Sequence, residues 1–203
     1  MKAILLGALL ATGQCCMAQS DTNLIATGDW SAPASEPIGR LSGPALRGRL
    51  AVYNAPEHQG RVYLELQRVS GQDVWSPPIG VFYDFTVRSS SLRLELRGSD
   101  ERPVSGRAGT ASAAGAQAAW VTIPSDSTVR LRATTYTTAH ATNSDGLEIL
   151  VSDGSWVIPA DATNDYYLSG TFAPTRDHAN APSYYLWQGI MKLPAVKIPA
   201  KRP

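Results

Sequence analysis

Cysteine is nearly absent from this sequence: Cys15 and Cys16 are the only two, and they stand side by side near the start of the chain. A mature protein that begins after them has no thiol and forms no disulfide, even in an oxidising compartment. The same absence removes the thiolate ligands of structural zinc sites, and the three histidines lack metal-ligand spacing. We therefore expect a fold held by its packed core, with no metal or other cofactor.

Neither sign of charge is in excess. The chain has 18 Lys and Arg against 17 Asp and Glu, and removal of Lys2 with a leader would leave 17 of each (18 − 1 = 17). A balanced charge predicts no broad attraction to nucleic acid or to anionic lipid. Nucleic acid is therefore not an expected partner.

Long hydrophobic runs are missing as well. The apolar run over residues 3–11 is too short to span a bilayer, which takes about twenty residues. A basic start, this run and the small and polar residues that lead to Ala18 together have the layout of a secretory signal. We expect a signal peptide over residues 1–18, a secreted or periplasmic location in the cell envelope, and no transmembrane segment after its removal. Lipidation of Cys15 or Cys16 is the alternative, although the residues before them do not match the lipoprotein pattern.

Helical spacing and catalytic motifs are the remaining absences. No window beyond the leader places apolar residues at the intervals of a helix face. The chain also lacks the Gly-x-Ser-x-Gly motif, which excludes serine hydrolases of the nucleophile-elbow type. No glycine-rich phosphate loop precedes a helix.

Alternation of apolar and polar residues is what the sequence does contain, and it predicts strands. Within residues 92–97 three leucines alternate with charged residues. We expect the leucines to face the core, while Arg93, Glu95 and Arg97 face water. The other expected strands cover residues 46–53, 62–67, 79–87, 120–123, 129–132, 147–151, 156–158, 166–172 and 184–193.

Turn residues predict two antiparallel hairpins. Pro124-Ser125-Asp126 separates the strands at 120–123 and 129–132. Asp153-Gly154 separates those at 147–151 and 156–158, and this dipeptide supplies the positive φ angles that a two-residue hairpin turn requires.

The strands together predict an all-β fold. We expect an antiparallel β-sandwich of about nine or ten strands, immunoglobulin-like or jelly-roll-like, because parallel pairing needs crossover helices for which there is no room. An extended arm is expected over residues 19–43, which are rich in Ser, Ala, Pro, Thr and Gly, followed by a single sandwich domain over 44–199. A flexible loop is expected near 98–118.

Candidate acids and bases are scattered along the chain. The carboxylates on expected strands, which could serve a glycosidase, are Glu65, Asp84, Glu95 and Glu148. Most of them are expected on a solvated face, whereas Asp84 stands between two aromatic residues and is the candidate for partial burial. The histidines, interpreted as ordinary surface residues, are His58, His140 and His178. The polar cluster interpreted as a set of turn hydrogen bonds rather than a calcium site comprises Asp161, Asn164 and Asp165.

Aromatic residues offer the best indication of a binding surface, because they can stack on sugar rings or anchor an interface. Those inside expected strands, for which core packing is expected, are Trp120, Trp156 and Trp187. The candidate ligand-binding residues are Trp75, Trp30, Tyr184 and Tyr185.

These observations favour a secreted, non-catalytic protein that binds a protein or glycan partner in the cell envelope or outside the cell. The alternative is a glycan-active or other hydrolase with an acid and base centred near Asp84. Clustering of Trp75, Asp84 and the three histidines in one cleft would favour the enzyme, and their dispersion would favour the binding protein.

Overall fold

A computed structural model of the chain describes residues 24–38, 41–55, 59–69, 79–84, 91–108, 118–125, 127–133, 146–151, 154–174 and 185–200. Regular structure within these residues is entirely β, which confirms the all-β fold class. The same part of the chain contains no helix long and apolar enough to cross a membrane. The expected leader over residues 1–18 lies outside it.

The largest sheet has eight strands, and its centre is a long antiparallel pair. That pair consists of β3 (Leu41–Ala55) and β4 (Gln59–Val69). The other strands of the sheet are β1 (Leu24–Thr27), β2 (Ala34–Ile38), β7 (Arg107–Ala108), β9 (Thr128–Arg132), β10 (Gly146–Val151) and β11 (Gly154–Pro159). β1 and β2 pair with β3. β9 and β10 pair with successive parts of β4, along the edge of β4 that faces away from β3.

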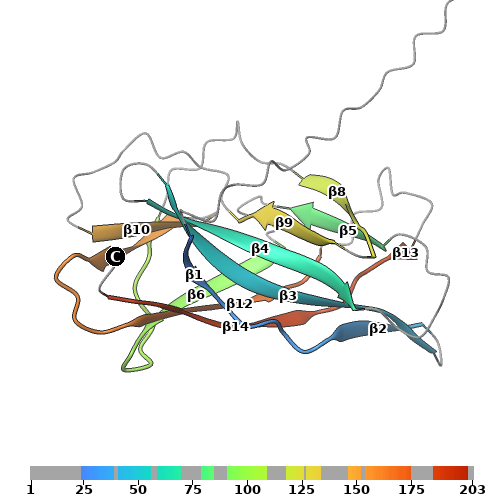
Figure 1. The fold of residues 1–203 in the computed structure, drawn as a ribbon, viewed down its shortest axis with the longest axis horizontal. Coiled ribbons are helices and arrows are strands. Elements are labelled where there is room, and N and C mark those ends of the chain that lie inside the picture. The colour runs from blue at the N-terminus through green and yellow to red at the C-terminus, as the bar shows by residue number, and fades with distance from the viewer. Residues whose placement is uncertain are drawn as a thin grey trace, which may run out of the picture.

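Two three-stranded sheets complete the fold. One has the order β14-β12-β6, with the bounds β6 (Leu92–Gly98), β12 (Tyr166–Phe172) and β14 (Met191–Ile198). The other has the order β13-β5-β8, with the bounds β5 (Ile79–Asp84), β8 (Ala118–Ile123) and β13 (Tyr185–Leu186). Figure 1 shows β6, β12 and β14 as a layer on one side of β3 and β4.

One hydrophobic core joins all three sheets. Gly48 of β3 lets β14 approach closely, since a Cβ at this position would lie 2.6 Å from the Sδ of Met191. The indole of Trp187 is buried and stacks on Phe172, with ring centroids 6.0 Å apart. Tyr83 of β5 donates a hydrogen bond to the carbonyl of Arg132, which ties β5 to β9.

The expected sandwich of nine or ten antiparallel strands differs from this architecture. The described residues form fourteen strands, of which β7 and β13 have two residues each. Two of the pairings are parallel: β10 with β4, and β13 with β5. Their partners lie far apart in sequence, so the chain returns through other strands of the fold and needs no crossover helix.

The prediction of a hairpin around Pro124 is wrong. β8 pairs with β5, and β9 pairs with β4, so the chain crosses from one sheet to another at this point. Turn residues signal a change of direction, but the same change serves a hairpin or a crossing between sheets.

The second expected hairpin is confirmed, since β10 and β11 pair antiparallel. Its register places Val151 opposite Gly154, so the two residues between the strands are 152 and 153, and Gly154 begins the second strand. The turn is therefore shifted by one residue from the expected Asp153-Gly154 position.

Residues 92–97 have the expected orientation: Leu92 and Leu96 are buried, Leu94 is half-buried against the core, and Arg93 and Arg97 are exposed. The run expected over 184–193 is divided between β13 and β14, which belong to different sheets.

Segments expected to be irregular also contain paired backbone. β1 and β2 fall within the expected arm over 19–43. In the expected loop near 98–118, the amide of Val104 donates to the carbonyl of Leu96, and β7 pairs with β11.

Candidate binding face

The outer face of β3, β4 and β9 carries an unusual concentration of arginine. Strand side chains alternate between faces, so the residues next to the core leucines point away from the core. The arginines on this face are Arg47 and Arg49 on β3, Arg61 on β4, and Arg130 and Arg132 on β9. Glu65 is the single acidic residue at the described positions of these strands on this side. We call this surface the arginine face.

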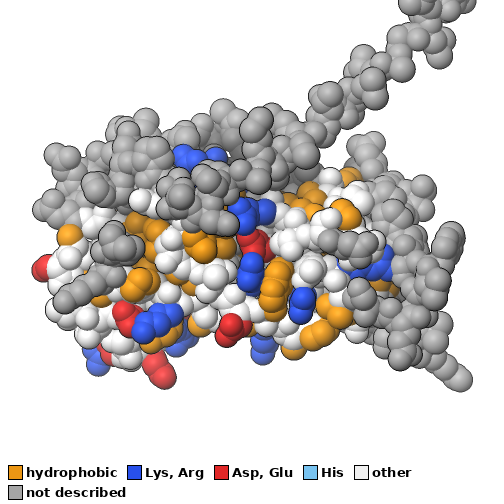
Figure 2. Space-filling view, in the orientation of Figure 1, with side chains coloured by type: hydrophobic (Ala, Val, Ile, Leu, Met, Phe, Trp, Pro, Cys, Tyr) orange, Lys and Arg blue, Asp and Glu red, His pale blue; other side chains and the backbone are white. Residues whose placement is uncertain are grey.

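Its formal charge contrasts with that of the whole chain. Five arginines and one glutamate give +4 (5 − 1 = 4), whereas the whole chain has +1, which leaves −3 for the remaining residues (1 − 4 = −3). Figure 2 shows Lys and Arg side chains gathered around an acidic group near the middle of the view, over β3 and β4. The balanced total charge therefore hides a strongly basic surface.

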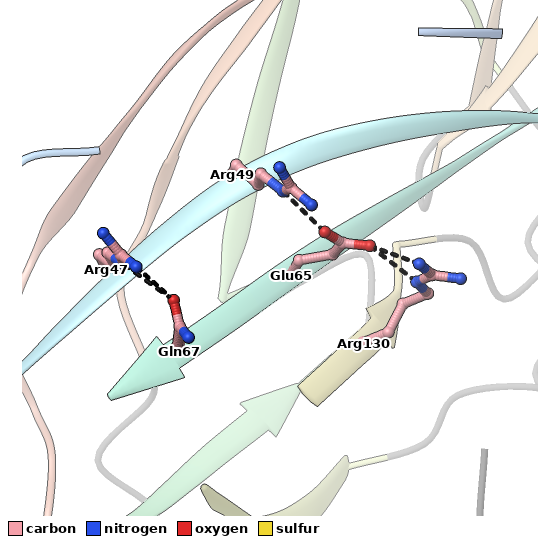
Figure 3. Close-up of polar contacts among 5 residues, drawn as sticks. All are labelled: Arg47, Arg49, Glu65, Gln67 and Arg130. Atoms are coloured by element: carbon pink, nitrogen blue, oxygen red, sulfur yellow. Dashed lines mark hydrogen bonds and ion pairs between the residues drawn. The ribbon is translucent and has the colours of Figure 1, made fainter. Parts of the chain in front are cut away.

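Glu65 organises the centre of this face. The register places Arg49 and Arg130 on either side of it, and Figure 3 shows both guanidinium groups turned toward its carboxylate. The Nε of Arg49 lies 2.8 Å from Oε2, and the Nη2 of Arg130 lies 2.7 Å from Oε1. The side chain of Glu65 is 2% exposed, so the expectation of a solvated glutamate is wrong, because two arginines cover it.

The same contacts affect Arg130. Burial opposes its charge, but the hydrogen bond and the negative charge of Glu65 outweigh burial and raise the pKa of Arg130. Its guanidinium also lies 4.7 Å from the ring centroid of Tyr53, which packs edge-on against Tyr63. Arg130 is thus held between a carboxylate and an aromatic ring.

Trp30 contacts the part of the arginine face that β3 contributes. The guanidinium carbons of Arg47 and Arg49 lie 5.0 and 4.6 Å from its ring centroid. Arg47 also donates from Nε and Nη2 to the side-chain oxygen of Gln67, at 2.9 and 2.6 Å (Figure 3). Of the four candidate ligand-binding residues, Trp30 is the one whose side chain the structure describes, and it contacts this surface.

Arg61 and Arg132 differ from the other three arginines. Neither makes a hydrogen bond or an ion pair within the described ranges, and the Nε atom of each is buried without a partner there. Burial first, and then the positive charge of Arg61, lower the pKa of Arg132. The two guanidinium groups therefore influence each other without an intervening anion in this part of the chain.

The other aromatic candidates are described in part or not at all. Trp75 and Tyr184 lie outside the described residues, and so does the side chain of Tyr185, whose backbone belongs to β13. Trp120 is half-buried beside Phe82, with ring centroids 5.0 Å apart. Core packing is thus complete for Trp187, described above, and partial for Trp120 and Trp156.

The structure describes part of the residues named in the hydrolase alternative. All three histidines and the side chain of Asp84 lie outside the described residues. Glu95 pairs with Arg97 at the surface. Glu148 is buried and accepts a 2.7 Å hydrogen bond from the hydroxyl of Ser155. The expectation of a solvated position for Glu148 is therefore wrong.

The polar cluster near residue 161 contains an ion pair. Asp165 lies 2.7 Å from the Nζ of Lys197 and also accepts a hydrogen bond from the amide of Ala200. Its hydrogen bond with Lys197 lowers the pKa of Asp165. The described residues contain no group of three or more His, Cys, Asp or Glu side chains arranged to hold a metal ion.

Comparison with known proteins adds no family to this picture: no family model, curated protein or solved structure matches the chain. The arginine face is therefore the feature of this protein that indicates a function.

Sequence reasoning missed this face although a signal was present. Arginines two residues apart occur at 47 and 49, and again at 130 and 132, each within a run that alternates apolar and polar residues. Such spacing places both guanidinium groups on one side of a strand. What it does not show is that the two runs lie on either side of β4.

Proposed function

We propose that this protein is a non-catalytic binding protein that acts in the cell envelope or outside the cell and holds an acidic glycan on its arginine face. The observation that supports this proposal is the formal charge of +4 gathered on one face of three adjacent strands of a nearly neutral chain. Concentrated charge attracts a partner of opposite sign and directs its approach.

The aromatic residues of this face favour charge recognition over stacking on a neutral sugar. Guanidinium groups already lie over the rings of Trp30 and Tyr53, and Tyr53 is buried. Ring surface that is covered in this way is not available to a sugar. The rings instead hold the arginines in place, which reduces the side-chain entropy lost on binding.

The face also favours a glycan over a protein partner. Protein interfaces are centred on apolar or aromatic anchors that become buried. The large hydrophobic residues exposed in the described structure are Leu24, Tyr167 and Ile190, and none of them lies on β3, β4 or β9. Hydrogen-bond donors on a regular strand lattice instead suit a chain with repeated carboxylate or sulfate groups.

No observation specifically favours a hydrolase. Both carboxylate oxygens of Glu65 are engaged by arginines, which suits a structural role better than proton transfer to a substrate.

Binding of polygalacturonate, poly-glutamate and neutral dextran at several salt concentrations tests the proposal. We expect polygalacturonate to bind and its affinity to fall with added salt. Arg47→Gln should weaken binding about two- to tenfold, as expected for loss of one partly exposed cation. Arg93→Gln is the matched control, because it removes the same charge from β6 in another sheet.

Failure of polygalacturonate to bind, or equal losses in the two variants, would refute the assignment of the arginine face. Binding of poly-glutamate alone would show that the partner is an acidic protein and would refute the glycan proposal.

A further inference from the structure

Arg61 and Arg132 are neighbours on the arginine face. The register pairs Arg132 with Tyr63, and Arg61 is two residues before Tyr63 on the same side of β4. Diagonal neighbours of this kind have Cα atoms about 7 to 8 Å apart, within the reach of two arginine side chains. Leu150 of β10 stands opposite Arg61 and is buried, so an apolar residue borders the pair.

This arrangement is unfavourable without an anion. Two like charges stand side by side, and each has a buried Nε–H that lacks an acceptor among the described residues. Buried donors are nearly always satisfied, and an unsatisfied one destabilises the folded state. The other three arginines of the face each have an acceptor, either Glu65 or Gln67.

We infer that Arg61 and Arg132 together form a subsite for one oxyanion group, a carboxylate, sulfate or phosphate, carried by the ligand. This inference rests on the proposed function and specifies the chemical group that the arginine face recognises. Guanidinium groups present planar sets of donors that match such oxyanions. The Nε atoms of both arginines are buried, and exclusion of water strengthens the attraction between the arginines and a bound anion.

Titration with small anions tests the subsite directly. Acetate, sulfate and phosphate are added separately at constant ionic strength, with chloride as the control, and the Nε–H signals of the arginines are followed by NMR. We expect saturable shifts for Arg61 and Arg132 with at least one oxyanion, and little change for Arg49 and Arg130, whose donors are already engaged. The anion that binds most tightly identifies the chemical group.

Arg61→Gln and Arg132→Gln should each weaken the binding of that anion about tenfold or more, whereas Arg93→Gln, on β6 in another sheet, should retain it. Both subsite variants should unfold at or above the temperature of the unmodified protein in low salt, because each removes one of two repelling charges. Lower unfolding temperatures would indicate an ordinary structural role and would overturn the inference. Absence of saturable shifts, or equal anion binding in both variants, would overturn it as well.

Polygalacturonate separates the two proposals. If it binds the unmodified protein and both subsite variants equally, the subsite is wrong and the proposed function stands. If small oxyanions bind the pair but no acidic polymer binds the protein, the subsite stands and the proposed function is wrong.

Discussion

Replacement of Glu65 by glutamine is the sharpest test of how the arginine face is held together. The substitution keeps the size of the side chain and one acceptor oxygen, but it removes the negative charge between Arg49 and Arg130. Any loss of stability therefore measures the charge at this position rather than a cavity.

The structure sets the magnitude of this effect. A hydrogen bond to a charged group contributes about 1.5 to 3 kcal/mol. The two arginines are 31% and 29% exposed, so water stabilises them in part once their partner is neutral. We expect Glu65→Gln to reduce the free energy of unfolding by about 2 to 3 kcal/mol. For a chain of this size, the midpoint of thermal unfolding should fall by about 4 to 12 °C.

Thermal and denaturant unfolding of the two proteins measure this difference, with Glu95→Gln as the control. Glu95 pairs with Arg97 at 2.9 Å, but both side chains are 46% exposed, so its loss should cost under about 1 kcal/mol. Added salt should narrow the gap between Glu65→Gln and the unmodified protein without closing it, because Glu65 itself is buried. Equal losses in the two variants would show that burial of Glu65 does not strengthen its ion pairs, and the reasoning would fail.

Two further predictions concern the three-stranded sheet formed by β6, β12 and β14. Leu96→Ala should reduce the free energy of unfolding by about 2 to 5 kcal/mol, since Leu96 is 1% exposed. Arg93 is exposed, so Arg93→Ala should reduce it by under about 1 kcal/mol. Similar values for the two variants would show that the leucines of β6 do not face the core. The ion pair between Asp165 and Lys197 lowers the pKa of the carboxyl group and raises the pKa of the amine. The stability that this ion pair contributes is therefore lost as the pH falls through the lowered carboxyl pKa, and also as the pH rises through the raised amine pKa. Asp165→Asn should therefore differ most from the unmodified protein between about pH 4 and pH 10, and a pH-independent difference in unfolding would contradict this account.

The sequence by itself determined where most strands lie and, for residues 92–97, which face is buried. Leu92 and Leu96 are buried and Arg93 is exposed as expected, because the direction of a strand side chain follows from a local period of two residues. The hairpin between β10 and β11 was predictable for a similar reason: its strands are neighbours in sequence and only two residues separate them.

Apart from this hairpin, only the tertiary structure decided which strands lie side by side. Pairing depends on contacts between residues distant in sequence, so alternation around Pro124 did not reveal that β8 and β9 belong to different sheets. The arginine face has the same origin. Its cations come from three separate strands and become one basic surface because β4 pairs with β3 on one side and β9 on the other. Net charge is a sum over the whole chain, whereas recognition depends on where the fold places each charge.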